Sequence, residues 1–296
     1  MFFYKEFRRR SGIKTRLISG AVGVAIIVTM LAINQRFEII INIVMALAAL
    51  LMVVELLTAK GLIKNLKISL PCMLYAAVTP ILWSNRMGNV PYNTALISTV
   101  VFTVLLFIIM VAYNDEISFN DISFAFALSI LITLSLSTII AMCDLDRTHA
   151  SFYVVLALGI PWLCDTGGLF VGLALGKHKL TPNISPKKTV EGAIGGVIIG
   201  TFSAAAIGFV FSNWIYTGDV YGMHVDYIIL LMIGFINSII AIFGDLSFSV
   251  IKRICHVKDY GTLIPGHGGI ADRFDSVILT APLLLIVTMY FPYIIK

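Results

Sequence analysis

Residues 226–244 read DYIILLMIGFINSIIAIFG, a run that carries no charge after Asp226. Its length matches the roughly 20 apolar residues that a helix needs to cross the hydrocarbon core of a bilayer. Eight more stretches of this kind lie before and after it, and short polar loops separate them. The nine predicted spans cover residues 17–33, 39–57, 68–84, 94–113, 122–142, 151–175, 190–212, 226–244 and 276–295. The sequence therefore predicts an all-α fold, a polytopic transmembrane helix bundle of about nine spans.

The composition agrees with a membrane protein and excludes other classes. Hydrophobic residues make up 59% of the 296 residues and charged residues only 12%, against about 25% charged residues in soluble domains. Disordered chains need low hydrophobicity and high net charge, and this chain has neither. Its four cysteines lie far apart with no C-x-x-C pair, so neither a disulfide framework nor a zinc site is predicted.

The distribution of basic residues predicts the orientation. With the N-terminus in the cytoplasm, 17 of the 21 Lys and Arg residues fall on the inside and four fall outside, and membrane proteins place their positive charges inside. The first residues, MFFYKEFRRRSGIKTR, lack a cleavage site of small residues, so we expect them to remain as a cytoplasmic arm. One inside loop, residues 113–121, is acidic and fits this orientation poorly.

The two halves of the chain differ in their polar residues. Residues 1–150 are predicted to form an N-terminal transmembrane scaffold, because their polar residues do not converge. Residues 151–296 are predicted to form a C-terminal catalytic region. Small residues recur there at four-residue spacing in two rows, Gly168, Gly172 and Gly176, then Gly192, Gly196, Gly200, Ala204 and Gly208. This spacing lets two helices approach closely in a membrane, so we interpret these residues as packing sites rather than ligand contacts.

The second predicted span contains Glu55, the sixth contains Asp165, and Glu191 opens the seventh. Such groups must face protein or water rather than lipid, and Asp165 lies in an otherwise apolar run. A basic loop follows Asp165 and contains Lys177, His178, Lys179, Ser185, Lys187 and Lys188. Two prolines stiffen this loop, so its lysines suit a polyphosphate. The alternative is a loop that only attracts anionic lipid headgroups.

A second polar cluster spans residues 244–275. Asp245 is predicted to end the eighth span, while Asp272 and Asp275 begin the ninth. If the segment between them folds back, these carboxylates converge and offer the hard oxygen ligands that Mg²⁺ needs when it also binds substrate phosphates. Lys252 and Arg253 could neutralise phosphate charge. The glycines around His267 provide backbone N–H groups that can approach an anion closely.

The segment from Ser249 to Asp275 reads S-x-x-K-R-x-x-x-x-K-D-x-G-x-x-x-P-G-H-G-G-x-x-D-R-x-D. It closely resembles the signature of the phosphatidate cytidylyltransferases, also called CDP-diacylglycerol synthases. The segments GKHKL and SPKKT-x-EG and the run Asp165-Thr166-Gly167 add to this resemblance. The resemblance is strong over the C-terminal half and rests on hydropathy in the N-terminal half.

The resemblance implies an enzyme of phospholipid biosynthesis that joins CTP and phosphatidic acid to give CDP-diacylglycerol and pyrophosphate. It also implies a multi-pass protein of the cell (inner) membrane, a homodimer, with its active site facing the cytoplasm and no nucleic-acid partner. The mechanism implied is in-line attack of a phosphatidate oxygen on the α-phosphorus of CTP. Positioning and electrostatics dominate such transfers, so no side-chain nucleophile is required.

The resemblance also implies roles for individual residues. The expected catalytic residues are Asp245, Asp272, Lys252, Arg253 and His267. The expected substrate-binding residues are Lys177, Lys179, Ser185, Lys187, Lys188 and Arg273. Mg²⁺, with a second divalent or monovalent ion, is expected at Asp245 and Asp272 first and then at Asp165 and Asp275. For His267, a role in stabilising its loop is the alternative. The chain departs from the family at Phe248, where a Glu is usual, and near Leu169, where an aromatic residue is common.

Two other functions compete with this interpretation. A transporter would also place carboxylates and broken helices in the membrane, but the chain shows no matching pair of interrupted spans in two halves. A relative that uses CTP on another lipid, such as a polyprenol kinase or an ether-lipid cytidylyltransferase, differs in the lipid it takes. Mass spectrometry of the lipid product would distinguish this second alternative from an enzyme that uses phosphatidic acid.

Overall fold

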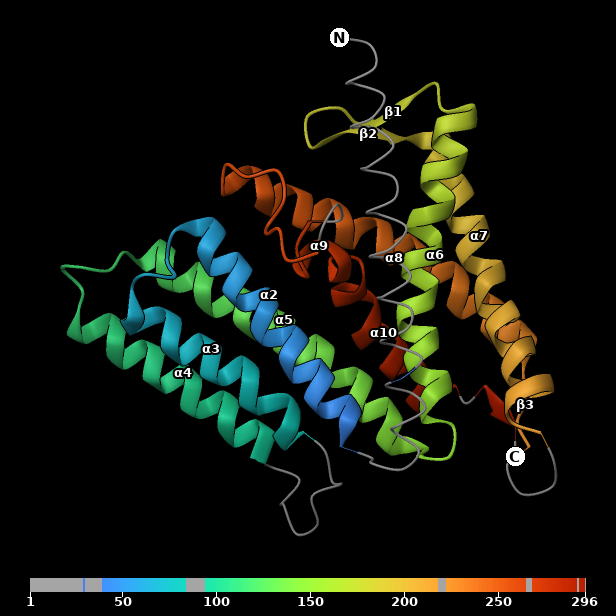
Figure 1. The fold of residues 1–296 in the computed structure, drawn as a ribbon, viewed down its shortest axis with the longest axis horizontal. Helices are drawn as coiled ribbons and strands as arrows, with labels where there is room; N and C mark the ends of the chain where they lie inside the picture. The colour runs from blue at the N-terminus through green and yellow to red at the C-terminus, as the bar shows by residue number, and fades with distance from the viewer. Residues whose placement is uncertain are drawn as a thin grey trace. The chain divides into compact units, whose positions relative to one another are not determined.

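The computed structural model describes residues 29, 39–83, 94–217, 222–264, 268–291 and 293–295. The first predicted span, apart from residue 29, lies outside these residues, as does His267. The helices are α2 (Ile40–Lys60), α3 (Leu66–Leu82), α4 (Thr94–Ala112), α5 (Phe119–Leu145), α6 (Ala150–Leu175), α7 (Val190–Val210) with its π-helical continuation η2 (Phe211–Ile215), α8 (Tyr227–Ile254), α9 (Ala271–Phe274) and α10 (Val277–Tyr290) (Figure 1).

Two small antiparallel sheets accompany the helices. Strand β1 (Lys179–Thr181) pairs with β2 (Ser185–Thr189), with Lys179 opposite Thr189 and Thr181 opposite Ser185. Strand β3 (His224–Val225) pairs with β4 (Ile294–Ile295). The β1–β2 hairpin lies at the end of α6 and leads into α7 (Figure 1). The basic loop predicted from the sequence is therefore an ordered hairpin.

The chain divides into two compact units, each of which is discontinuous. Unit 1 holds residues 1–133 and 255–274, and unit 2 holds residues 134–254 and 275–296. The first boundary falls inside α5. The segment 255–274, here called the signature loop, thus belongs to the unit of the N-terminal helices, although it lies between α8 and α10 in sequence. The predicted division at residue 150 was one of function, and it stays a prediction.

In unit 1, helices α3 and α4 pack through aromatic and hydroxyl side chains. The ring of Tyr75 stacks on that of Phe102 with 4.3 Å between centroids, and Phe102 lies 6.1 Å from Phe126. The hydroxyl of Tyr75 is 3.0 Å from that of Thr99. Buried hydroxyl groups are costly in an apolar interior unless they find such partners, so these contacts fix how the two helices align.

Ion pairs join the two polar loops of unit 1. Lys67 Nζ lies 2.5 Å from Glu116 Oε2 and 3.6 Å from the centroid of the Tyr113 ring. Lys60 Nζ lies 4.0 Å from Asp121 Oδ1. The acidic loop that fitted the predicted orientation poorly is therefore paired with lysines from the preceding basic loop. Both loops lie at the same end of the unit 1 helices.

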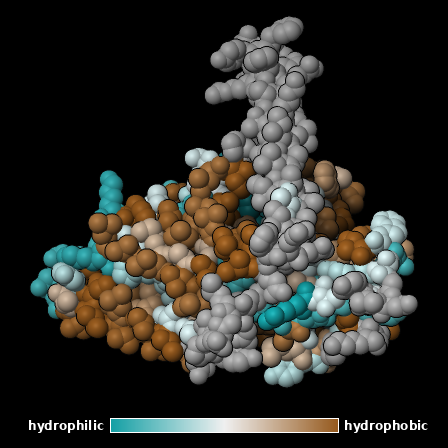
Figure 2. Space-filling model, turned by 60° about the horizontal axis from the view of Figure 1, so that its bottom comes forward, coloured by the Kyte–Doolittle hydropathy of each residue, from teal (hydrophilic) through white to brown (hydrophobic). Residues whose placement is uncertain are grey.

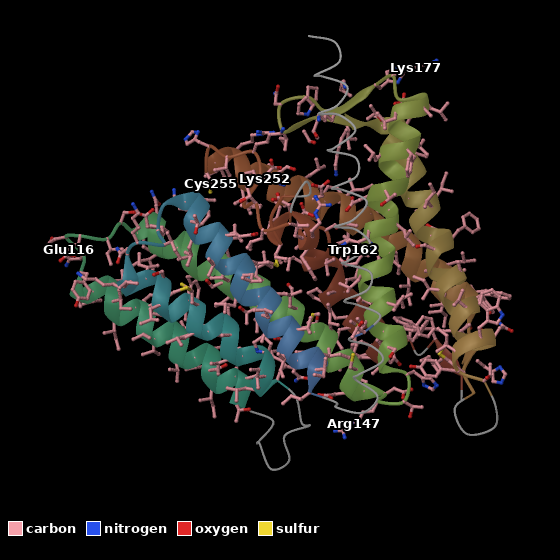
Figure 3. The ribbon with its side chains drawn as sticks, viewed as in Figure 1. Glu116, Arg147, Trp162, Lys177, Lys252 and Cys255 are labelled. Atoms are coloured by element: carbon pink, nitrogen blue, oxygen red, sulfur yellow. The ribbon has the colours of Figure 1, made fainter. Side chains whose placement is uncertain are left out.

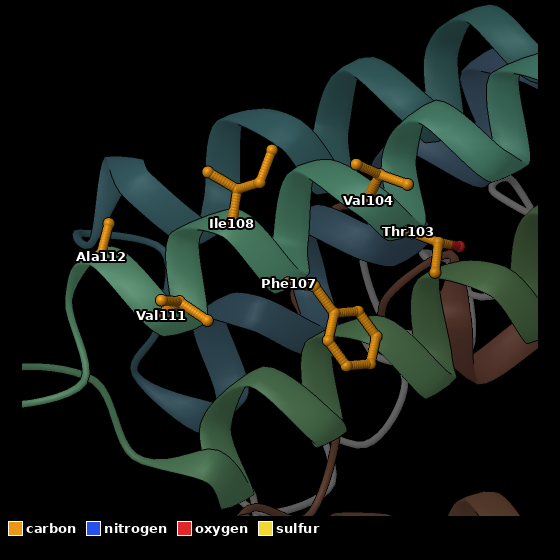
Figure 4. Close-up of a pocket in the computed structure, with 6 residues that line it drawn as sticks. All are labelled: Thr103, Val104, Phe107, Ile108, Val111 and Ala112. Atoms are coloured by element: carbon orange, nitrogen blue, oxygen red, sulfur yellow. The ribbon is translucent and has the colours of Figure 1, made fainter.

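Much of the surface is apolar, as expected of helices that face lipid. Figure 2 shows hydrophobic residues over much of the face that it draws. Helix α4 exposes large side chains such as Leu96, Val100 and Val111. A shallow hollow along this helix is lined by Thr103, Val104, Phe107, Ile108, Val111 and Ala112 (Figure 4). Lipid chains suit such a surface better than water does.

In unit 2, the rows of small residues bring α6 and α7 into contact. A Cβ atom on Gly168 would lie 3.2 Å from the carbonyl oxygen of Gly192, and one on Gly196 would lie 2.8 Å from that of Cys164. The predicted packing role of these glycines is confirmed. Because the backbones themselves touch, the helices are held at a fixed separation.

The predicted fold class is confirmed at the level of a helical membrane protein with several spans. Eight of the nine predicted spans coincide with helices. Six helices are long and apolar enough to cross a membrane, namely α2, α4, α5, α6, α7 with η2, and α8. Helices α3 and α10, with 17 and 14 residues, are shorter apolar helices. The count of nine spans and the orientation stay predictions.

Candidate active site

Three carboxylates of unit 2 come from three different parts of the chain. Asp165 lies in α6, Asp245 in α8, and Asp275 directly before α10. Asp275 is only 6% exposed. Burial raises the pKa of Asp275 above its ordinary value, and the negative charges of Asp245 and Asp165 raise it further. Asp275 therefore lies close enough to Asp245 and Asp165 for their negative charges to act on it.

Two lysines supply positive charge to these carboxylates. Lys188 of β2 forms an ion pair with Asp245. Lys252 Nζ lies 3.7 Å from Asp275 Oδ2, and the side chain of Lys252 is 12% exposed. Lys252, which Figure 3 labels, follows Asp245 by seven residues of α8, and this spacing places both on one face of that helix. The cluster of Asp165, Asp245, Asp275, Lys188 and Lys252 is called the carboxylate–lysine cluster below.

Helix α8 supplies two more side chains next to Asp245. The hydroxyl of Ser249, one turn later, lies 3.5 Å from Asp245 Oδ1. Phe248 is 1% exposed and belongs to the buried core. The position where the resembled family usually has Glu is thus apolar in this chain and filled by packing.

The β1–β2 hairpin is fixed at both ends, which places Lys188. The carboxylate of Glu191 in α7 accepts hydrogen bonds from the backbone N–H groups of Lys177 at 3.0 Å and His178 at 3.2 Å, and it lies 2.6 Å from His178 Nδ1. The guanidinium Nε of Arg253 donates to the carbonyl of Ile184 at 3.3 Å. Arg253 thus connects the hairpin turn to α8.

Neighbouring lysines of β2 differ in their surroundings. Side chains alternate along a strand; Lys188 is half-buried and paired with Asp245, whereas Lys187 is exposed. Lys177 and Lys179 are exposed as well (Figure 3 labels Lys177). The structure therefore separates one lysine at the carboxylates from three at the outer surface of the hairpin, a distinction that the sequence did not provide. Ser185 begins β2 and is half-buried.

The signature loop of unit 1 is organised by Asp272. Its Oδ2 atom accepts hydrogen bonds from the backbone N–H groups of Tyr260 at 2.9 Å and Gly269 at 3.0 Å. Gly268 has a φ of 90°, in the left-handed region that glycine adopts most readily. A Cβ atom there would lie 2.9 Å from Asp272 Oδ2. Arg273, next in the chain, is exposed.

Glu55 also reaches this loop, which the sequence did not predict. It lies in α2, is 4% exposed, and accepts hydrogen bonds from the N–H groups of Ile270 at 3.0 Å and Ala271 at 2.8 Å. Glu55 thus links the half of the chain that the sequence assigned to the scaffold with the signature loop of the C-terminal half. Its charge within an apolar span marked Glu55 in the sequence, but that signal did not indicate its partners.

One predicted feature of Asp245 is wrong. The sequence placed it at the end of the eighth span, but α8 continues to Ile254. The segment after Asp245 has helix-compatible residues and no glycine or proline, so nothing stops the helix there. The carboxylate lies inside a helix, and Lys252 and Arg253 lie in its last turn, where their charges favour the helix dipole.

The sequence also matches a known protein family. Residues 14–291 match the model of the cytidylyltransferase family. The chain belongs to this family. The family predicted from the sequence is confirmed.

Curated relatives of this cytidylyltransferase-family chain carry the name phosphatidate cytidylyltransferase. That of Bacillus subtilis (strain 168) is 37% identical over 184 residues, which cover 62% of this chain and 64% of the relative. That of Staphylococcus haemolyticus (strain JCSC1435) is 34% identical over 218 residues, 73% of this chain and 78% of the relative. That of Staphylococcus aureus (strain COL) is 44% identical over 138 residues, 47% of this chain and 49% of the relative. The chain thus spans less than two thirds of the Bacillus relative.

The donor set of this cytidylyltransferase-family site suits a magnesium ion that arrives with a nucleotide. Among the described residues, no three His, Cys, Asp or Glu side chains are arranged to hold a metal ion. Mg²⁺ in nucleotide sites usually takes only one or two carboxylates and completes its shell with phosphate oxygens and water. Asp245 and Asp275 offer hard oxygens of this kind. The assignment of Asp272 as a metal ligand, and of the exposed lysines as phosphate contacts, stays a prediction.

Proposed function

We propose that this chain is a phosphatidate cytidylyltransferase of phospholipid biosynthesis, which transfers the cytidylyl group of CTP to phosphatidic acid. The products are CDP-diacylglycerol and pyrophosphate. The observation that carries the proposal is the carboxylate–lysine cluster in a chain of the cytidylyltransferase family. The acids offer oxygen ligands to the metal ion of a metal–triphosphate substrate, and the lysines offer positive charge to its phosphates.

The reaction joins two substrate groups and needs no covalent intermediate on the protein. An oxygen of the phosphatidate phosphate bonds to the α-phosphorus of CTP while the bond from that phosphorus to the pyrophosphate oxygen breaks. Lys188 and Lys252 offset the negative charge of the triphosphate and of the leaving pyrophosphate. All four cysteines are buried, which agrees with a mechanism that uses no thiol.

Asp245 and Asp275, together with Asp165 and by prediction Asp272, would hold Mg²⁺, with or without a second ion. The metal would supply charge neutralisation of the triphosphate and alignment of the two reactants. The protein groups that surround the nucleotide would be Lys188, Lys252 and, at the surface of the hairpin, Lys187. Exclusion of water from Asp275 strengthens every charge interaction there.

We further propose that the chain crosses the cell membrane nine times, with its N-terminus and active site on the cytoplasmic side. The 17 to 4 distribution of basic residues supports this orientation, and CTP is a water-soluble substrate. We also propose that the enzyme works as a homodimer in the bilayer, as its resemblance implies.

Purified protein with CTP, phosphatidic acid and Mg²⁺ tests the proposal. We expect pyrophosphate release that needs all three, and a lipid product whose mass equals that of the phosphatidate plus the cytidylyl group. ATP, GTP and UTP serve as matched controls. Release with a polyprenol or an ether lipid but not with phosphatidic acid would replace the proposed acceptor, and absence of any CTP-dependent release would overturn the proposed enzyme.

A further inference from the structure

We propose that Glu55 of α2 is a positioning residue of the active site, which holds the signature loop in the conformation that presents Asp272 and Arg273. The inference rests on the proposed function, because those two residues were assigned to it from the family resemblance. Glu55 lies in the half of the chain that the sequence assigned to the scaffold. The contacts of Glu55 described below lie within unit 1.

The carboxylate of Glu55 completes a row of three consecutive backbone donors. Gly269 N–H donates to Asp272, while Ile270 N–H and Ala271 N–H donate to the two oxygens of Glu55. Successive N–H groups of this kind form a concave site for an anion. The glycine-rich segment was expected to approach an anion closely, and among the described residues the anions at its backbone N–H groups are the carboxylates of Asp272 and Glu55.

Two glycines of the loop leave room for Glu55. A Cβ atom on Gly261 would lie 2.5 Å from Glu55 Oε1, and one on Gly269 would also lie 2.5 Å from this oxygen. Real Cβ atoms do not approach oxygens this closely, so any larger residue at either position must displace the carboxylate. The loop sequence therefore fits Glu55 by shape as well as by hydrogen bonds.

The charge of Glu55 also requires an explanation beyond packing. An acid in a membrane span is costly, and such residues are usually functional. Asp272 lies close enough to Glu55 for their charges to interact unfavourably. An apolar residue would avoid that repulsion but would leave the N–H groups of Ile270 and Ala271 unsatisfied. Glu55 therefore holds the backbone directly before Asp272 and Arg273.

The first test compares Glu55→Gln with wild type and with Glu116→Gln, a control that removes a carboxylate from the surface pair with Lys67. The amide keeps the size of Glu55 but places an NH₂ group against one of two N–H donors. An unsatisfied buried donor costs enough to change a rate about tenfold or more. We expect kcat to fall at least that far with the KM for CTP within about threefold, since misplacement acts on the transition state. The control should match wild type.

Amide hydrogen exchange gives a second readout that does not need turnover. In Glu55→Gln, residues 269–271 should exchange faster, while α6 and α7 keep their protection. Faster exchange with unchanged kcat would overturn the positioning role and leave a purely structural one. Unchanged exchange would overturn the contact itself. Failure of the wild-type protein to use CTP would instead overturn the proposed function, and the exchange result would still be measured.

Rescue by a shorter acid completes the test. Gly261→Ala places a methyl group against the Glu55 carboxylate and should lower kcat strongly. Glu55→Asp withdraws the carboxylate by one methylene, so the double variant should recover a large part of the kcat lost in Gly261→Ala. If the decrease in kcat of the double variant equals the product of the decreases in the two single variants, Gly261 and Glu55 act independently. That result would overturn the proposal.

Discussion

Each of two acids in the carboxylate–lysine cluster has a lysine partner, and this pairing offsets the negative charge of both acids. Asp245 meets Lys188 and Asp275 meets Lys252. Removing one partner from a buried pair leaves an uncompensated charge, which is costly. In the proposed complex, the lysines would meet phosphate groups of CTP and the acids would meet its metal ion. The charges of these residues would then be offset with or without substrate.

The first prediction concerns Asp245. Asp245→Asn keeps the size of the side chain but removes the charge that a divalent cation requires, so CDP-diacylglycerol formation should fall below about 1% of wild type. The protein should still insert and purify, because the Asn side chain can accept a hydrogen bond from Lys188. Product formation by mass spectrometry and the yield of folded protein are the two measurements. Substantial Mg²⁺-dependent turnover would exclude Asp245 as a metal ligand.

The second prediction separates the lysines of the hairpin. Lys188→Gln should raise the KM for CTP about tenfold or more, since a charge-assisted contact to phosphate contributes about 1.5–3 kcal/mol. Lys187→Gln should have a smaller effect, because Lys187 is exposed. Lys64→Gln, which removes an exposed lysine from the loop between α2 and α3, is the matched control. An equal change in the KM for CTP in Lys188→Gln and Lys64→Gln would show that the hairpin lysines only attract anionic lipid headgroups.

Among the elements, long apolar helices were predictable and irregular connections were not. Eight predicted spans match helices because hydropathy over about 20 residues averages out local errors. The extension of α8 was missed because residues 246–254 mix apolar and polar residues and no longer look like a span. The β1–β2 hairpin was missed because Glu191 and Arg253 hold it through contacts that depend on the fold. Glu55 was noticed as an acid in a span, but its partners 215 and 216 positions later could not be derived from spacing.

The third prediction tests the contact of α6 with α7. A Cβ atom on Gly192 would lie 2.7 Å from the carbonyl oxygen of Gly168 and 3.2 Å from the Cα atom of Gly172. These are backbone atoms that cannot turn aside, so Gly192→Ala should destabilise the protein by about 1–3 kcal/mol. Thermal unfolding in detergent measures this, with Ala206→Val on the exposed face of α7 as the control. An unchanged midpoint for Gly192→Ala would show that the helices can separate freely.

For the whole molecule, family and helical membrane character followed from the sequence, while the division into units did not. A discontinuous unit depends on which distant segments pack together, and hydropathy carries no such information. The orientation rests on charge counts alone. The ion pair of Lys67 with Glu116 shows that the acidic and the basic loop of unit 1 lie at the same end of its helices.

The fourth prediction tests this orientation in intact cells. Because the four native cysteines are buried, single introduced cysteines can be labelled against a low background. Cysteines in place of Lys64 and Lys187 should be shielded from a membrane-impermeant thiol reagent, whereas one in place of exposed Thr148 should react. Permeabilised cells provide the positive control. Labelling of the Lys187 position from outside would reverse the proposed orientation.

The signature loop is synthesised long after α2, although both belong to unit 1. The two N–H groups that donate to Glu55 belong to residues 270 and 271. A ribosome adds about 5–20 residues per second, so it needs roughly 10–40 s to add the residues between Glu55 and these donors. Throughout that interval α2 has already been synthesised, and Glu55 lacks these two hydrogen-bond donors. The first unit of the protein therefore matures only after most of the second has been translated, and a nascent chain released before residue 270 keeps an acid in its membrane helix without those two donors.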